Sequence, residues 1–136
     1  MDFKTIFAWI LRIVAAFILL QTLYFKFTGS AESVELFTKL VGADLEAYMR
    51  IGTGIVELLT AALLLMPRTV FLGAFLGMGV MVGAILSHFV ALGIESGGDG
   101  GQLFLYAIIV FLCCVGIQVL YKNQAISLYN QYVLKA

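Results

Sequence analysis

The sequence predicts an all-α integral membrane protein, a single domain over residues 1–136 that folds as a bundle of four transmembrane helices. Of the 136 residues, 62% are hydrophobic and 12% are charged, whereas a soluble domain has about a quarter charged residues and about half apolar ones. Four apolar runs approach the roughly 20 residues of a spanning helix. None alternates as a barrel strand would, so helices remain as the way to satisfy the backbone in lipid. The predicted spans are Thr5–Phe25, Ile51–Met66, Thr69–Leu92 and Leu103–Tyr121.

The first apolar run is predicted to be retained in the protein as a spanning helix. Arg12 interrupts its apolar residues, and no small-residue cleavage site precedes Lys26, so the run does not read as a removable signal peptide.

Four spans place both termini on the same side of the membrane. The lysines and arginines next to the spans favour the terminal side by four to three, so both termini are predicted to be cytoplasmic. The formal net charge is zero, which argues against a nucleic-acid partner.

The connections between the spans also carry structural signals. In the first connection, Ser30 is a suitable N-cap, an apolar face follows at helical spacing, and Gly42 suits the end of a short amphipathic helix on the outer membrane face. Asp44 is expected to cap the second span, with Glu46 in its first turn. The Pro67-Arg68 turn predicts a tight hairpin of the second and third spans. The third connection, Glu95–Gly101, is glycine-rich and is expected to be a flexible linker.

Helical wheels place a small or polar stripe on every span. On the third span, small residues are expected to face the bundle, with the packing spacings Gly73-x-x-x-Gly77 and Gly79-x-x-x-Gly83. On the second span, Glu57 points inward. At about 1.5 Å rise per residue, most polar groups converge on one pocket in the outer half of the bundle. The predicted pocket residues are Lys26, Arg50, Glu57, His88, Gln102 and Tyr106, whereas Arg12 lies nearer the cytoplasmic side as a structural polar group.

Each of these groups has a structural and a functional interpretation. Glu57 has Lys26 and His88 as candidate partners by depth, and it either fastens helices together as an ion pair or acts as a functional acid. His88 either shuttles a proton or bonds to Glu57 or a loop carbonyl. One histidine with one nearby acid falls short of a zinc site, so no metal is expected. Cys113 and Cys114 are neighbours on one helix, which disfavours a disulfide and favours packing.

The order of these features along the chain resembles one family. An arginine early in the first span (Arg12) is followed by Tyr24-Phe25-Lys26, the amphipathic segment, GIVELL with Glu57, Pro67-Arg68, and His88 late in the third span. Over roughly residues 8–121 this arrangement resembles the DoxX family of small bacterial membrane proteins. One departure is that Gly29 follows Lys26, whereas the family commonly has a glycine shortly before that lysine.

The resemblance implies a four-helix bundle in the bacterial cytoplasmic membrane and a link with redox work, because the family is named after a subunit of a quinone-reducing thiosulfate oxidoreductase. Other members associate with oxidative-stress enzymes or act as accessory or assembly factors. The resemblance therefore supports the fold more than a reaction.

Two functional hypotheses of different class follow. In the first, the chain is a subunit of a quinone-linked redox system. Glu57 and His88 exchange protons, Lys26, Arg50, Gln102 and Tyr106 line the ligand pocket, and a protein partner supplies the electrons. In the second, the chain is a non-enzymatic scaffold or assembly factor that acts as a homo-oligomer or with a protein partner. Its polar cluster is then structural, and its working surface is the amphipathic helix around Phe37 or the glycine-rich linker. A transporter is a weaker third hypothesis, because no inverted repeat is evident.

Overall fold

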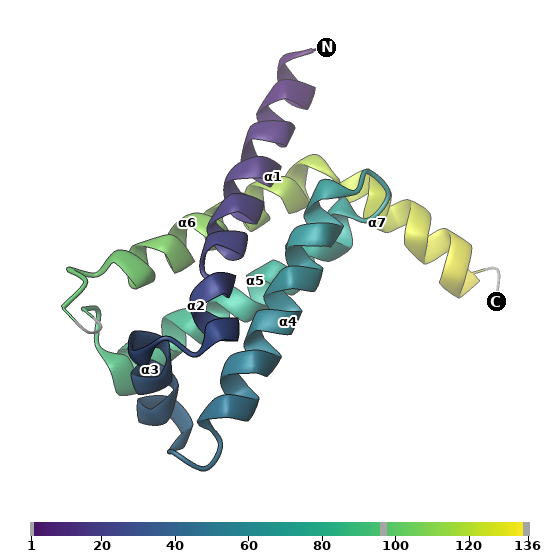
Figure 1. Ribbon diagram of the computed structural model, residues 1–136. Coiled ribbons are helices and arrows are strands. Elements are labelled where there is room, and N and C mark those ends of the chain that lie inside the picture. Colours follow the sequence, from purple (N-terminus) through teal and green to yellow (C-terminus); the bar gives the residue numbers. More distant parts are fainter. Residues whose placement is uncertain (1, 96–97, 135–136) are drawn as a thin grey trace.

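The computed structural model describes residues 2–95 and 98–134, and every regular element of secondary structure in this part of the chain is a helix (Figure 1). Among the described residues, four helical segments are long and apolar enough to cross a membrane. They cover Phe3–Thr28, Glu46–Leu65, Val70–Leu92 and Gln102–Leu120. The predicted fold class is therefore confirmed, with each span close to its expected position.

The first span consists of two helices, α1 (Phe3–Gln21) and α2 (Leu23–Thr28), separated at Thr22. The hydroxyl of Thr22 donates to the carbonyl of Leu19 at 3.0 Å, a local bond of the kind that bends helices. At the start of α1, the side chain of Asp2 accepts from the amide of Thr5 at 2.9 Å. This hydrogen bond is the main reason that the pKa of Asp2 is lowered.

The first connection forms α3 (Ala31–Val41) and leads into α4 (Glu46–Leu65). As predicted, Ser30 caps α3 by accepting from the amide of Ser33, and Gly42 ends the helix with a positive φ of 87°. The prediction for Asp44 is wrong. The N-cap of α4 is Leu45, which makes no side-chain capping bond, because a turn bond from the Leu45 amide to the Gly42 carbonyl moves the helix start beyond Asp44.

Helices α4 and α5 (Val70–Ser87) form the predicted hairpin. Gly73 and Gly77 lie at this contact: a Cβ on Gly73 would lie 2.8 Å from the backbone nitrogen of Leu64. The same prediction for Gly79 and Gly83 is wrong, because a Cβ on either would meet nothing within 4 Å. At 100° per residue, Gly79 lies about 200° around the helix from Gly77, so the two glycine pairs occupy different faces.

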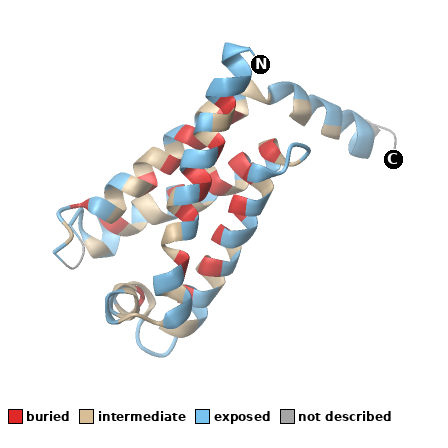
Figure 2. Cartoon of the chain, turned by 45° about the horizontal axis from the view of Figure 1, so that its top comes forward, coloured by how far each residue is buried: buried red, intermediate tan, exposed pale blue. Residues whose placement is uncertain are grey.

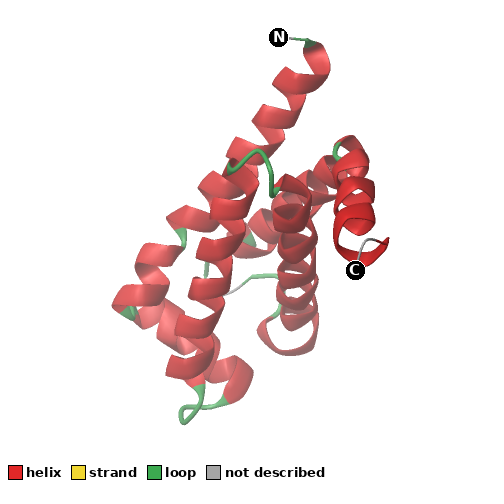
Figure 3. Cartoon of the chain, turned by 90° about the vertical axis from the view of Figure 1, so that its right-hand side faces the viewer, coloured by secondary structure: helices red, strands yellow, loops and turns green. Residues whose placement is uncertain are grey.

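The third span continues as a short π-helix, η1 (His88–Leu92). The fourth is α6 (Gln102–Leu120), whose first turn is capped by both carboxylate oxygens of Asp99, accepting from the amides of Gly101 and Leu103. The residues of the predicted flexible linker at positions 96 and 97 lie outside the described residues. The chain ends with α7 (Lys122–Tyr129) and η2 (Asn130–Leu134), which lead away from the spanning helices (Figures 1 and 3).

The core lies between the four spanning segments. Helix α1 packs against α4 and α6, and α5 packs against the same two helices. Buried residues mark the facing sides of the helices (Figure 2), and many of them are small: Ala15, Ala16, Ala61, Ala74 and Ala107. Large apolar side chains such as Phe75 remain exposed on the outside. Small residues inside and bulky ones outside are the pattern of helices that pack within lipid.

Candidate functional site

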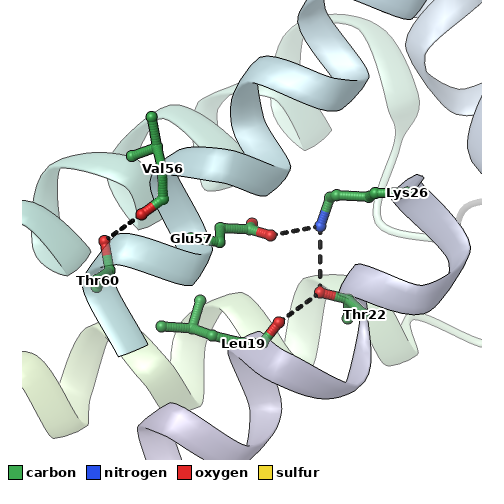
Figure 4. A network of polar contacts seen from close by, with 6 residues as sticks. All are labelled: Leu19, Thr22, Lys26, Val56, Glu57 and Thr60. Atoms are coloured by element: carbon green, nitrogen blue, oxygen red, sulfur yellow. Dashed lines mark hydrogen bonds and ion pairs between the residues drawn. The ribbon is translucent and has the colours of Figure 1, made fainter. Parts of the chain in front are cut away.

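Lys26 and Glu57 form a buried ion pair between α2 and α4 (Figure 4). The ammonium nitrogen of Lys26 lies 2.7 Å from Oε2 of Glu57, and it also donates to the hydroxyl of Thr22 at 3.2 Å. The exposed fractions of the two side chains are 14% for Lys26 and 7% for Glu57. Of the two partners that depth suggested for Glu57, the structure thus brings Lys26 to it.

The local sequence explains why the pair forms. Glu57 is on the buried face of α4, together with Gly54, Thr60 and Ala61. Gly54 lets α2 approach, because a Cβ there would lie 2.7 Å from the ring of Phe27. Thr22 stands one turn before Lys26, and its hydroxyl accepts from the ammonium while donating to Leu19. The Thr60 hydroxyl donates back to the carbonyl of Val56, so it does not compete for Glu57 (Figure 4).

Arg50 fastens the other end of α2 to α4. Its Nε donates to Glu46 at 3.0 Å, and its Nη1 donates to the carbonyl of Lys26. Gly29 ends α2 in the left-handed region, with a φ of 69°, directly beside the Arg50 guanidinium. The glycine that follows Lys26 therefore has a role of its own, because it ends the helix where Arg50 can reach the last carbonyls.

The remaining predicted pocket residues have other partners. Nδ1 of His88 lies 2.8 Å from the carbonyl of Gly93, and its ring meets that of Phe104 edge to face. This is the loop-carbonyl bond that was one of the two structural interpretations of His88. On α6, the amide of Gln102 donates to the hydroxyl of Tyr106 at 2.7 Å, in an exposed position. The hydrogen bonds of the predicted pocket thus form separate sets, and within the described residues no hydrogen bond joins His88 or Tyr106 to the Lys26–Glu57 pair.

The family of this chain follows from a match to a model of a known protein family. The family model described as "DoxX-like family" matches residues 10–117. The chain belongs to the DoxX-like family. No curated protein and no solved structure matched the chain.

The matched region of this DoxX-like protein contains all seven polar residues that the sequence singled out, from Arg12 to Tyr106. Chemically, the Lys26–Glu57 pair offers one ammonium with a further N–H and one carboxylate with a further oxygen. Among the described residues, no group of three or more His, Cys, Asp or Glu side chains gathers as metal ligands. Cys113 and Cys114 are free thiols in the core, where Gly77 packs against the sulfur of Cys114.

Among the residues that the structure describes, Arg12 is the most deeply buried charged residue of the DoxX-like bundle, with 2% exposure. Its Nε donates to the carbonyl of Leu64 at 2.6 Å, in the last turn of α4. Its guanidinium carbon lies 3.7 Å from the ring centre of Trp9, and its Nη1 lies 3.4 Å from the hydroxyl of Tyr121. Sequence analysis singled out Arg12 as a structural polar group, but it identified none of these partners.

Sequence analysis did not single out two further residues that make polar contacts between or within helices, Thr22 and Gln124. Thr22 carried one signal, its position four residues before Lys26 on a helical face. Gln124 carried none: from α7 it donates to the carbonyl of Pro67 at 2.9 Å and accepts from the amide of Phe71 at 2.7 Å. It therefore holds α7 against the turn of the α4–α5 hairpin, and an isolated polar residue in a polar helix gives no indication of such a contact.

Proposed function

We propose that this DoxX-like protein is an accessory subunit of a membrane redox system, with the Lys26–Glu57 pair as the element that fixes the outer part of the bundle. One observation carries the accessory role: the two opposite charges, which sequence analysis placed in a ligand pocket, are bonded to each other at 2.7 Å. The redox setting rests on the resemblance to the DoxX family.

The contacts around the pair support a fastening role. A charge in a spanning helix is costly unless it is paired. Lys26, Glu57 and Arg50 together connect α2 to α4 through a side-chain pair and a backbone carbonyl. Because α3 follows α2 and packs against α4 and η1, this connection also fixes the position of α3.

The position of α3 specifies where a protein partner would bind. Phe37, which we expected within the working surface, is buried with 5% exposure and so holds α3 to the bundle. The exposed residues of α3 are Ala31, Glu32, Glu35 and Lys39, of which the last two form an exposed ion pair at 3.4 Å. We assign partner binding to this exposed face of α3.

A second candidate function is binding of a quinone headgroup at the Lys26–Glu57 pair. It is favoured by the unused capacity of the pair: within the described residues, Lys26 donates to two acceptors with its three N–H groups, and Glu57 accepts through one oxygen. A quinone carbonyl would accept from Lys26, while the apolar ring would lie against the bundle.

The double variant Lys26→Met/Glu57→Gln distinguishes the two functions, because it removes both charges and leaves no unpaired one. If the chain is an accessory subunit, this variant co-purifies from native membranes with the same partner at the same ratio as the wild type, because Arg50 still donates to the main-chain carbonyl of residue 26 and keeps α2, and with it α3, in place. Charge reversal on α3, Glu32→Lys/Glu35→Lys, abolishes this association. If the association is instead lost in the charge-free variant and kept in the α3 variant, the accessory assignment is wrong.

The same two variants test the second candidate function, quinone binding, with purified protein. A soluble short-chain ubiquinone or menaquinone analogue is titrated while the melting temperature is recorded. Binding at the pair gives a saturable rise in melting temperature that disappears in Lys26→Met/Glu57→Gln and persists in the α3 variant. No rise with the wild type, or an equal rise in the charge-free variant, excludes quinone binding at this pair.

A further inference from the structure

A second charged centre lies at the opposite end of the bundle from the Lys26–Glu57 pair, around Arg12. Arginine stays protonated in proteins, so a full positive charge is buried here at 2% exposure. Its contacts are the carbonyl of Leu64, the Trp9 ring and the Tyr121 hydroxyl. Within the described part of the chain, Arg12 has no ion-pair partner, and its Nη2 is buried without a hydrogen-bond partner.

The neutral contacts offset only part of the cost of this charge. The C-terminal end of a helix such as α4 favours a nearby cation, because its last carbonyls carry partial negative charge. A cation over an aromatic face is also attracted by the ring. Neither supplies the anion that normally accompanies a buried guanidinium. The centre therefore has the electrostatic character of a site that lacks its counter-ion.

A cavity of about 260 Å³ lies next to this centre, lined by Lys4, Thr5, Ala8, Leu120 and Tyr121. Ala8 is one turn of α1 before Arg12, and Tyr121 belongs to both the cavity and the hydrogen bond with Arg12. Because Arg12 donates to the Tyr121 oxygen, the hydroxyl proton of Tyr121 is free to point toward another acceptor. Lys4, a positively charged residue, lines the same cavity, and the Asp2 carboxylate is engaged as the N-cap of α1.

We propose that this cavity binds an anionic phosphate group, with the ammonium of Lys4 and the hydroxyl of Tyr121 as direct donors. Arg12 acts behind Tyr121 as a positioning residue: it holds the hydroxyl oxygen, and its charge lowers the electrostatic cost of bringing a phosphate close. The phosphate comes from an anionic phospholipid or from solution. Charge-assisted hydrogen bonds to phosphate are short and strong. The predicted cytoplasmic location of the N-terminus places the cavity at the leaflet where anionic lipids gather.

The single tryptophan provides the assay, because Trp9 stacks on Arg12 and so reports on the charge beside it. Purified full-length protein in a neutral detergent is titrated with dioctanoyl phosphatidylglycerol, dioctanoyl phosphatidylcholine or sodium phosphate while Trp9 fluorescence is followed. The wild type gives a saturable change with phosphatidylglycerol at lower concentration than with phosphatidylcholine. Saturation by sodium phosphate at equal or lower concentration identifies free phosphate as the source, whereas saturation by phosphatidylglycerol alone identifies the lipid.

Variants locate the site within the molecule. Tyr121→Phe removes only the hydroxyl, and Lys4→Gln removes only the ammonium; each weakens binding by about tenfold, as expected for the loss of a hydrogen bond to a charged group. Lys122→Gln is the matched control, because it removes one exposed positive charge from the neighbouring residue, outside the cavity lining. Its affinity stays within about twofold of the wild type, the size of a surface-charge effect. The proposal is overturned if phosphatidylglycerol and phosphatidylcholine bind equally, if Tyr121→Phe binds like the wild type, or if Lys4→Gln and Lys122→Gln weaken binding equally.

Discussion

Removing the charges of Lys26 and Glu57 one at a time and together tests the buried ion pair quantitatively. Lys26→Met leaves Glu57 without a partner at 7% side-chain exposure. Breaking a buried pair costs about 3–5 kcal/mol, and the partial exposure of the site favours the lower end, about 3 kcal/mol. Glu57→Gln costs less, about 1–2 kcal/mol, because Lys26 keeps its bond to Thr22 and its long stem can reach toward the membrane surface.

The double variant Lys26→Met/Glu57→Gln leaves no unpaired charge, so we expect it within about 1 kcal/mol of the wild type. The two single effects then exceed the double effect by about 3 kcal/mol, which is the coupling between the residues. The assay is reversible unfolding in mixed micelles, with the helical circular dichroism signal followed as denaturing detergent is added. Additive effects, with the double variant the least stable of the three, would refute the assignment of an energetically coupled pair.

Three further predictions concern helix packing and helix ends. Gly73→Ala destabilises the hairpin by about 1–3 kcal/mol relative to Gly79→Ala in the same unfolding assay, because both gain the same helix propensity but only the first meets backbone at 2.8 Å; equal stability would contradict the close approach. The lowered pKa of Asp2 means that its cap stabilises α1 above the pKa of the unfolded chain and is lost as the pH falls through the folded-state pKa. Hydrogen exchange at the Thr5 amide should accelerate over that acidic window beyond the intrinsic pH effect, and Asp2→Ala should remove the change. Gln124→Ala removes both bonds that hold α7 to the hairpin, so exchange protection of α7 should fall by about tenfold or more while the spanning helices keep theirs.

The features that the sequence predicted correctly depend on one helix or on two helices at a known depth. Ser30 could be identified as a cap because the capping bond is local. Glu57 could be placed inward because a helical wheel fixes its direction, and Lys26 could be proposed as its partner because both lie at similar depth. The hairpin followed from the Pro67-Arg68 turn, which leaves the two spans no separation.

The features that were missed depend on how helices are rotated relative to one another. Gly83 has the same motif spacing as Gly77 but lies about 120° away on the wheel, outside the contact with α4. For His88 the helical wheel left two structural partners open, Glu57 and a loop carbonyl, because the chain changes to a π-helix at this residue; the ring nitrogen bonds to the carbonyl of Gly93. Thr22 donates to a carbonyl of its own helix and separates α1 from α2. A helical wheel drawn continuously through Phe25 does not include this break.

Arg12 shows most clearly why depth and direction do not give the partners of a buried charge. The charges at the other end of the bundle are balanced by carboxylates, Lys26 by Glu57 and Arg50 by Glu46, and carboxylates are visible in a sequence. Arg12 is held by a main-chain carbonyl in the last turn of α4 and by two aromatic rings. Every helix ends in unsatisfied carbonyls, so the sequence does not indicate which helix end the arginine will meet. Among the described residues, no carboxylate pairs with Arg12, and this distinguishes the two centres chemically: the Lys26–Glu57 pair is internally neutral, whereas the Arg12 centre retains a positive charge that can attract an external anion.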